Sequence, residues 1–128
     1  MSSQVKVQQR RLTTEELNDL IIDSIQDIKG KNIIKLDLRR LEESPTDFFI
    51  ICEGDSNTQV KAISDNIQKR LKKDGSVLAS HVEGERNALW ICLDYFTTVV
   101  HVFYRETRSF YELENLWSDA RFTEYESL

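Results

Sequence analysis

The segment Phe48–Cys52 is a run of five apolar residues with no polar interruption. A strand with one wet face alternates apolar and polar side chains, so an unbroken run indicates a strand covered on both faces. Other parts of the chain must supply both covers. The chain has 128 residues, 40% of them hydrophobic, which suits a single domain with one core.

Helical and strand patterns alternate on either side of this run. Apolar spacing predicts helices over residues 15–29, 56–75 and 107–117, and strands over 32–38, 48–52, 77–82, 89–93 and 99–103. The order α-β-β-α-β-β-β-α indicates an α/β (α+β) domain, with a single mixed sheet of about five strands packed by helices. The unit from the second strand to the third is expected to be a right-handed parallel crossover. The short link 94–98 predicts an antiparallel hairpin.

The ends of the elements carry their own signals. Thr13 with Glu16, and Ser56 with Gln59, have the spacing of capping boxes at helix N-termini. The polar start predicts a flexible N-terminal arm at 1–12, followed by a domain at 13–120. Residues 121–128 are expected to form an acidic C-terminal tail, which two aromatic residues could dock back onto the domain.

The charge balance restricts the class of partner. The chain has 17 basic and 22 acidic residues, a net charge of −5, and every acid lies after residue 12. The remainder, with 14 basic residues, therefore carries −8. Such a charge disfavours direct, non-specific nucleic-acid binding. No apolar run approaches the ~18 residues of a membrane span, so no membrane partner is expected.

Cysteine and histidine do not indicate a catalytic or metal centre. Cys52 and Cys92 stand forty residues apart inside apolar strands, where a thiol behaves as a small hydrophobe. No ligand spacing with His81 or His101 resembles a zinc site. We expect no cofactor and no metal, and a reducing, cytoplasmic location.

The turn Gly54–Ser56 is the one candidate for phosphate chemistry, because it leaves a strand and opens a helix. A metal-dependent nucleotidyltransferase acting on a small substrate would also need paired carboxylates on the next strand. That strand has no Asp-x-Asp pair, and Asp37 and Asp94 stand alone. The chain is therefore predicted not to be an enzyme, and the nucleotidyltransferase is kept as the alternative.

Aromatic residues close to charged ones suggest an interaction surface. Trp90 opens a strand, and tryptophan is enriched both in cores and in interfaces, so both roles stay open. His101 should be neutral and should point away from the side of Val100 and Val102. A core position and an interface position are both compatible with it.

Four blocks in order resemble the ribosomal silencing factor family, also called the RsfS or Iojap family. Together they span about residues 14–120. The blocks are DFFIICEGDS at 47–56 with QVKAI at 59–63, then VEG at 82–84, WICLDY at 90–95 with VVHVF at 99–103, and YELENLWSDA at 111–120.

The resemblance implies a small nucleotidyltransferase-like fold without the catalytic carboxylates. It further implies a translation repressor that binds the large ribosomal subunit through its fourteenth protein, blocks association with the small subunit, and acts under nutrient limitation. Little direct nucleic-acid contact is expected, and a homodimer is possible. The implied partner-binding residues are Trp90, Asp94, Tyr95, His101, Lys61 and Glu83.

One departure from the family pattern lies in the predicted hairpin. Many members have Gly-Asp after an Asp-Tyr or Asp-Leu pair, whereas this chain has Phe96-Thr97-Thr98. Without glycine, which adopts positive φ at no steric cost, the turn geometry is expected to differ. Phe96 could then be an added anchor for the partner or a residue of the core.

Overall fold

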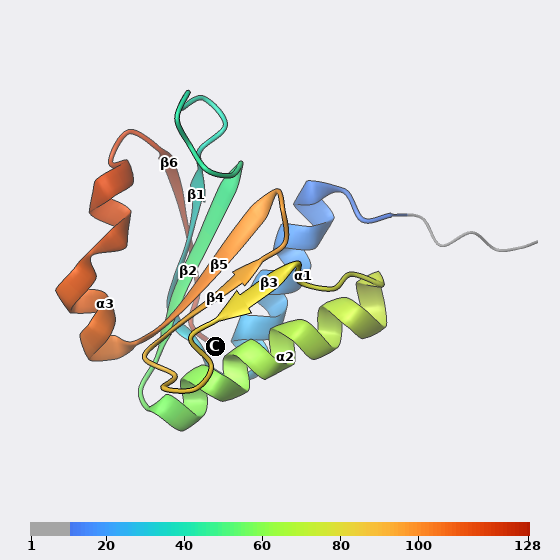
Figure 1. Ribbon diagram of the computed structural model, residues 1–128, viewed down its shortest axis with the longest axis vertical. Helices are drawn as coiled ribbons and strands as arrows, with labels where there is room; N and C mark the ends of the chain where they lie inside the picture. The colour runs from blue at the N-terminus through green and yellow to red at the C-terminus, as the bar shows by residue number, and fades with distance from the viewer. Residues whose placement is uncertain (1–10) are drawn as a thin grey trace, which may run out of the picture.

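The structure is a computed structural model that describes residues 11–128. Its helices are α1 (Thr14–Asp27), α2 (Asn57–Gly75) and α3 (Arg105–Tyr111), followed by a 3-10 helix, η1 (Leu113–Trp117). Its strands are β1 (Lys31–Asp37), β2 (Phe48–Gly54), β3 (His81–Glu83), β4 (Trp90–Asp94), β5 (Thr98–Tyr104) and β6 (Arg121–Tyr125). The strands form one sheet in the order β3-β4-β5-β2-β1-β6 (Figure 1).

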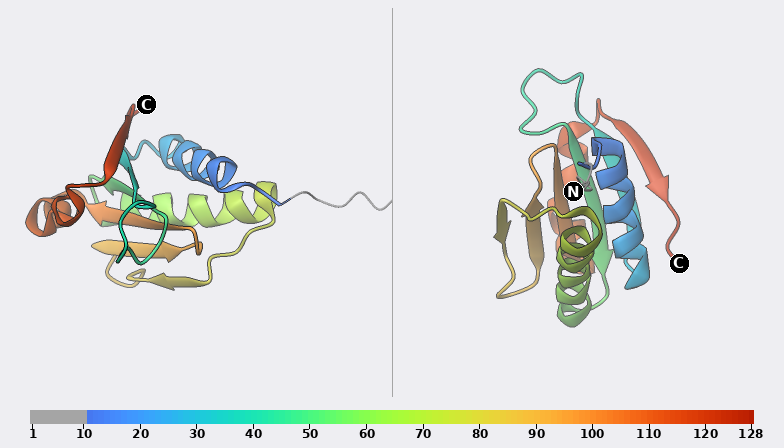
Figure 2. Two further views of the ribbon diagram at one scale, coloured as in Figure 1. Left: turned by 90° about the horizontal axis from the view of Figure 1, so that it is seen from above. Right: turned by 90° about the vertical axis from the view of Figure 1, so that its right-hand side faces the viewer.

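The sheet separates two unequal layers. The longer helices α1 and α2 lie side by side on one face, and α3 lies on the other (Figures 1 and 2). All seven residues of β2 are buried, which confirms that the apolar run is covered on both sides. The mixed α+β class with one sheet is thereby confirmed.

Each face of the sheet has its own apolar cluster. The larger cluster packs α1 and α2 against inward-facing residues such as Ile50, Ile91 and Val100, all fully buried. The smaller cluster lies under η1 and includes Leu36, Ile51 and Phe103. Because α3 and η1 are short, they leave part of this second face of the sheet open to other contacts.

The strands before and after α2 run parallel, as predicted for a crossover, because β3 is antiparallel to β4, β4 is antiparallel to β5, and β5 is parallel to β2. These two strands are not neighbours in the sheet. β2 pairs in parallel with β5, from Phe48 opposite Thr98 to Gly54 opposite Tyr104. β3 is paired with β4 instead, at the edge of the sheet. The antiparallel hairpin of β4 and β5 lies between β3 and β2 in the sheet. This hairpin was correctly predicted. Local sequence does not encode which strands become neighbours.

The sheet has six strands rather than about five. The segment expected as a C-terminal tail contains β6, which pairs antiparallel with β1 from Asp37 opposite Arg121 to Ile33 opposite Tyr125. Its residues RFTEY are mostly exposed, so they lack a clear apolar alternation. The strand is held instead by its ladder with β1. The ammonium of Lys35 also lies over the ring of Tyr125, 5.9 Å from its centroid.

Two element boundaries also differ. The helix expected over 107–117 breaks at Glu112, whose φ of 47° is left-handed, and continues as η1. The third strand begins at His81 rather than at residue 77. The predicted arm falls largely on residues 1–10, outside the described part of the chain. Leu12 packs against the larger cluster.

The helix caps are largely as predicted. Thr13 and Glu16 form the full capping box of α1. At α2, Ser56 accepts from the amide of Gln59 at 3.1 Å, while the Gln59 side chain accepts from the amide of Asp55 at 2.7 Å. Gln59 also donates to the carbonyl oxygen of Ile28, which ties α2 to the end of α1.

Candidate functional site

The sheet face opposite α1 and α2 carries a cluster of aromatic rings. Strand alternation puts Trp90 of β4, His101 and Phe103 of β5 and Phe49 of β2 on this side, because Trp90 lies opposite Phe103 in the ladder. Tyr111 of α3 and Trp117 of η1 complete it from above. We call this set the aromatic face: Phe49, Trp90, His101, Phe103, Tyr111 and Trp117.

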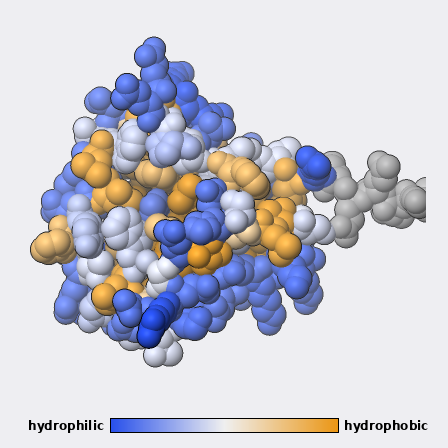
Figure 3. Space-filling model, viewed as in Figure 1, coloured by the Kyte–Doolittle hydropathy of each residue, from blue (hydrophilic) through white to orange (hydrophobic). Residues whose placement is uncertain are grey.

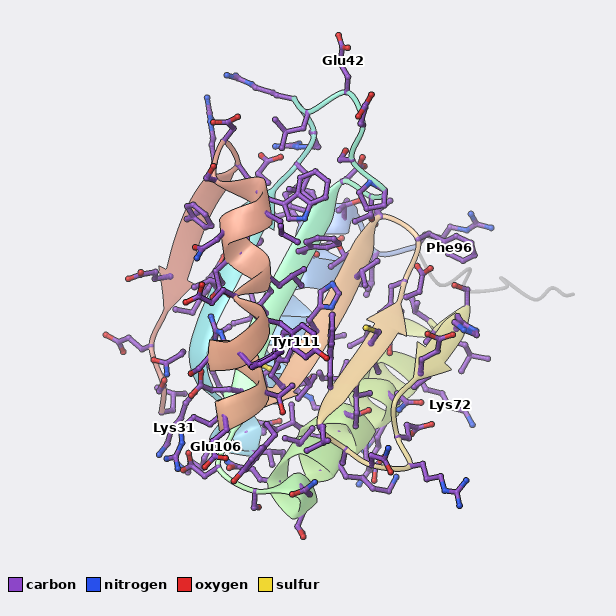
Figure 4. All side chains as sticks on the ribbon, turned by 60° about the vertical axis from the view of Figure 1, so that its left-hand side comes forward. Lys31, Glu42, Lys72, Phe96, Glu106 and Tyr111 are labelled. Atoms are coloured by element: carbon purple, nitrogen blue, oxygen red, sulfur yellow. The ribbon has the colours of Figure 1, made fainter. Side chains whose placement is uncertain are left out.

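Trp90 is the centre of the aromatic face. Its ring stacks on Phe103 with centroids 4.8 Å apart, and Tyr111 lies 5.0 Å away on another side. Its indole Nε1 donates to Nδ1 of His101 at 3.0 Å. These contacts fix the side chain while leaving it half-buried rather than sealed. Figure 4 shows Tyr111 lying over the sheet on this side.

His101 is a buried, neutral ring. It is 7% exposed, and this burial lowers its pKa to about 4. Because Nδ1 accepts from Trp90, the proton of the neutral ring sits on Nε2. Nε2 has no partner among the described residues. The ring also meets Phe49 edge-on at 4.7 Å, so it lies between Phe49 and Trp90.

The thiols of Cys92 and Cys52 are not activated as nucleophiles. Burial raises the pKa of Cys92 to about 11 and that of Cys52 to about 12. A reactive cysteine requires the opposite shift. The approach of Cys92 Sγ to His101 Nδ1, 3.5 Å, therefore does not make a catalytic pair.

A buried ion-pair network holds α3 and η1 against the sheet. Arg108 of α3 donates to Glu53 of β2 at 3.2 Å and to Glu114 of η1 at 2.8 Å. It also donates to the carbonyl oxygen of Asn32. The side chains of Arg108 and Glu53 are 10% and 9% exposed. Because α3 has only seven residues and no side-chain N-cap, these bonds are a principal restraint on the position of Tyr111.

Gly84 allows the chain to leave β3 close to the backbone of Trp90. Its φ is 90°, and a Cβ atom there would lie 2.0 Å from the carbonyl oxygen of Trp90. Any side chain would push apart the link between β3 and β4. The glycine thus helps to place Trp90 on the face.

The structure brings four of the six predicted partner-binding residues onto one side of the sheet. Trp90, Asp94 and His101 share the aromatic side, and Glu83 lies opposite Cys92 on the same side of β3. Glu83 is exposed, and its carboxylate lies 2.7 Å from His81 Nε2. Two acidic side chains therefore share the side of the outer strands on which Trp90 lies, both toward the Asp94 end of β4.

The other two predicted residues lie elsewhere. Tyr95 points to the opposite face and is 3% exposed within the larger cluster. Burial raises its pKa to about 12. Lys61 is exposed on α2, on the far side of the sheet, with Asp65 at 3.7 Å and Glu85 at 3.9 Å. Neither side chain belongs to the aromatic face.

Four members of the aromatic face were absent from the predicted set. The alternation that places His101 also places Phe49 and Phe103 on its side, so strand parity could have found these two. Tyr111 and Trp117 depend on the left-handed break at Glu112. No periodic pattern in the sequence indicates that break.

The carboxylates that the nucleotidyltransferase alternative would need are engaged elsewhere. Within residues 11–128, no group of three or more His, Cys, Asp or Glu side chains is placed to hold a metal ion. Asp37 pairs with Arg39 at 2.7 Å, which lowers its pKa to about 2. Asp55 pairs with Lys31 at 2.9 Å and with Arg105 at 3.5 Å.

Within residues 11–128, none of the helices has the length and apolarity to cross a membrane.

Fold and site together define a small mixed α/β domain whose chemistry is that of a binding surface. Apolar patches set among polar side chains mark its surface (Figure 3). The chain belongs to the family described as "Ribosomal silencing factor during starvation", whose model matches residues 11–128. It is a regulator of translation and not an enzyme.

Similarity to individual relatives extends over most of the chain. It is 33% identical over 117 residues to the ribosomal silencing factor RsfS of Halalkalibacterium halodurans, covering 91% of this chain and 98% of the relative. Identity to RsfS of Chromobacterium violaceum is 39% over 107 residues, which cover 84% of this chain and 86% of the relative. A crystal structure of a protein from Chromobacterium violaceum superposes with a TM-score of 0.79 at 38% identity, covering 84% of this chain and 88% of that one.

Proposed function

We propose that the protein silences ribosomes by docking its aromatic face on the fourteenth protein of the large ribosomal subunit. Bound there, the domain occupies space that the small subunit needs, so the two subunits fail to associate and translation is repressed under nutrient limitation. The observation that carries the proposal is the incompletely covered aromatic face, with Trp90 half-buried at its centre. We propose that the protein is located in the cytoplasm, where it would bind the large ribosomal subunit.

The energetics of an aromatic anchor support this choice of surface. Tryptophan and tyrosine dominate binding hot spots because they bury much apolar area at little cost in side-chain entropy. Trp90 is held in one orientation by His101 and Phe103 before any partner arrives, which lowers that cost further. Tyr111, 52% exposed, adds area beside it.

Charge supports a basic protein partner over RNA. The described part of the chain is acidic, and Glu83 and Asp94 lie on the docking side with Trp90. An acidic surface attracts a basic ribosomal protein and accelerates encounter, whereas it repels the phosphates of ribosomal RNA. We therefore propose contacts that are mainly between proteins.

The six residues expected at the interface divide into different roles. Trp90, Asp94 and Glu83 are the proposed contacts, and His101 acts by holding Trp90. Tyr95 supports β4 from below, and Lys61 lies on the side that would face away from the subunit. A second copy of the chain could use the same face in a homodimer, which would then compete with the ribosome.

A sucrose-gradient experiment with purified ribosomes tests the proposal. Excess protein should raise the free subunits at the expense of whole ribosomes and should co-sediment with the large subunit. Trp90→Ala should weaken large-subunit binding by at least ~2 kcal/mol, about thirtyfold. Lys61→Ala, on the opposite side of the molecule, is the matched control and should bind like the wild type.

The experiment also separates the proposal from its rivals. Saturating protein that leaves the ribosome profile unchanged would refute silencing by subunit separation. A folded Trp90→Ala variant with wild-type affinity would remove the aromatic face from the interface even if silencing is observed. Magnesium-dependent nucleotide turnover by the purified chain would restore the nucleotidyltransferase alternative.

A further inference from the structure

The tip of the β4–β5 hairpin has an unusual backbone. Phe96 has a φ of 69°, in the left-handed region that disfavours bulky side chains. The other described non-glycine residues with positive φ are not aromatic: they are Lys29, Asn32, Ser76, Ala88 and Glu112. Two of these are helix C-caps, where left-handed geometry is common. Phe96 thus adopts at a turn a backbone conformation that glycine reaches at no steric cost.

Neighbouring groups hold this conformation from both sides. The amide of Phe96 donates to Asp94 Oδ1 at 2.8 Å, and its carbonyl oxygen accepts from Thr46 Oγ1 at 2.8 Å. The turn is closed by the amide of Tyr95, which donates to the carbonyl oxygen of Thr98 at 2.9 Å. Thr46 is buried, so its hydroxyl is a fixed donor. The tip is therefore rigid rather than loose.

Burial of the Phe96 ring does not offset the strain of its backbone. The side chain is 75% exposed, so it gains little from burial. Figure 4 shows Phe96 projecting from the hairpin tip at the edge of the molecule, beyond the end of β4. A residue kept in a strained conformation at the surface points to a role outside the monomer.

The position of the tip relates it to the aromatic face. β4 runs from Trp90 to Asp94, so Phe96 lies beyond one end of the strand and Trp90 lies at the other. Asp94, on the docking side, binds the Phe96 amide directly. A partner that spans the length of β4 would meet both aromatic side chains with an acidic group between them.

We propose that Phe96 is a second, pre-positioned anchor of the docking surface, which inserts into an apolar depression bordered by basic side chains on the same large-subunit protein. The inference rests on the proposed function and adds a determinant of partner specificity to it. The rigid turn fixes the direction of the ring, so little entropy is lost on binding. Phe96 thus trades stability of the monomer for affinity.

Replacing Phe96 by glycine separates these two quantities. Phe96→Gly relieves the strain, so its melting temperature should equal or exceed that of the wild type, while its affinity for purified large subunits should fall at least tenfold. Phe96→Ala keeps the left-handed backbone but loses the ring, and it should lose affinity to the same degree. Phe122→Ala is the control, because it removes an exposed aromatic ring at the other end of the sheet, on β6. Its affinity should stay at the wild-type level.

The outcomes distinguish this inference from the proposed function. Wild-type affinity of Phe96→Gly, with Trp90→Ala weakened, would overturn the role of Phe96 and leave the docking face intact. Absence of large-subunit binding by the wild-type chain would overturn both. Loss of self-association in Phe96→Gly, measured by analytical ultracentrifugation, with unchanged subunit binding, would assign the ring to a homodimer and would also overturn the inference.

Discussion

The indole Nε1 of Trp90 donates a hydrogen bond to Nδ1 of His101, at 3.0 Å, across the β4–β5 ladder. The two residues are diagonal neighbours, since Trp90 lies opposite Phe103 and Cys92 opposite His101. Only a neutral His101 can accept at Nδ1, because the protonated ring is a donor at both nitrogens. The orientation of Trp90 therefore depends on the protonation state of a buried histidine.

Acid should destabilise the protein through His101. The folded-state pKa, about 4, lies below the ordinary value of 6.5, so the unfolded chain binds this proton more readily. The associated stability is fully present above pH 6.5 and is lost as pH falls to 4, by at most about 3 kcal/mol. Urea unfolding at pH 7 and pH 4.5 measures it. In His101→Gln, which does not titrate, the fall over the same interval should be smaller; an equal fall would exclude His101 as its source.

A double-mutant cycle should reveal coupling between Trp90 and His101. Trp90→Phe keeps an aromatic ring on Phe103 but leaves Nδ1 of His101 buried with only the weak thiol donor of Cys92, at a cost of about 1–3 kcal/mol. His101→Phe in that background removes the orphaned acceptor. The double variant should therefore lose less stability than the sum of the single losses, by about 1 kcal/mol. Additive losses, measured by urea unfolding, would mean that the hydrogen bond contributes nothing measurable.

The sequence predicted what depends on local pattern. The buried run of β2, the capping boxes and the hairpin follow from alternation, side-chain chemistry and link length. The neighbours of β2 could not be read in this way, because β5 is fifty residues further along the chain. For the site, alternation placed His101 correctly, but the cover supplied by Tyr111 depends on one left-handed residue, Glu112. Phe96 was left undecided between core and surface, and its position is held in part by Thr46, fifty residues earlier in the chain.

The sixth strand provides a direct test of where the folded domain ends. A chain ending at Ala120 would lack β6, leaving the edge of β1 open and Ile33, now 1% exposed, without its partner strand. We expect a loss of about 2 kcal/mol or more in the free energy of unfolding, with aggregation through the open edge. Chemical unfolding and light scattering measure both effects.

A shorter truncation controls for the loss of chain length. Removing only Ser127 and Leu128 keeps β6 and deletes one hydrogen bond, from the Asn32 amide to Ser127 Oγ at 3.1 Å. The expected loss is below about 1.5 kcal/mol. If the chain ending at Ala120 were as stable as this control, residues 121–128 would contribute nothing to the stability of the domain.

Arg108 should be the residue of α3 on which the docking face most depends. Arg108→Met would leave Glu53 buried without its cation and would release Glu114, at a cost of about 3 kcal/mol or more. Hydrogen exchange over residues 105–117 should accelerate more than exchange over β2, because α3 is too short to persist without tertiary contacts. Arg105→Met is the matched control: Arg105 is 56% exposed, its contact with Asp55 is 3.5 Å, and its loss should cost less than about 1 kcal/mol. Equal effects of the two variants would show that α3 is held by apolar packing, and that the buried ion pairs do not position Tyr111.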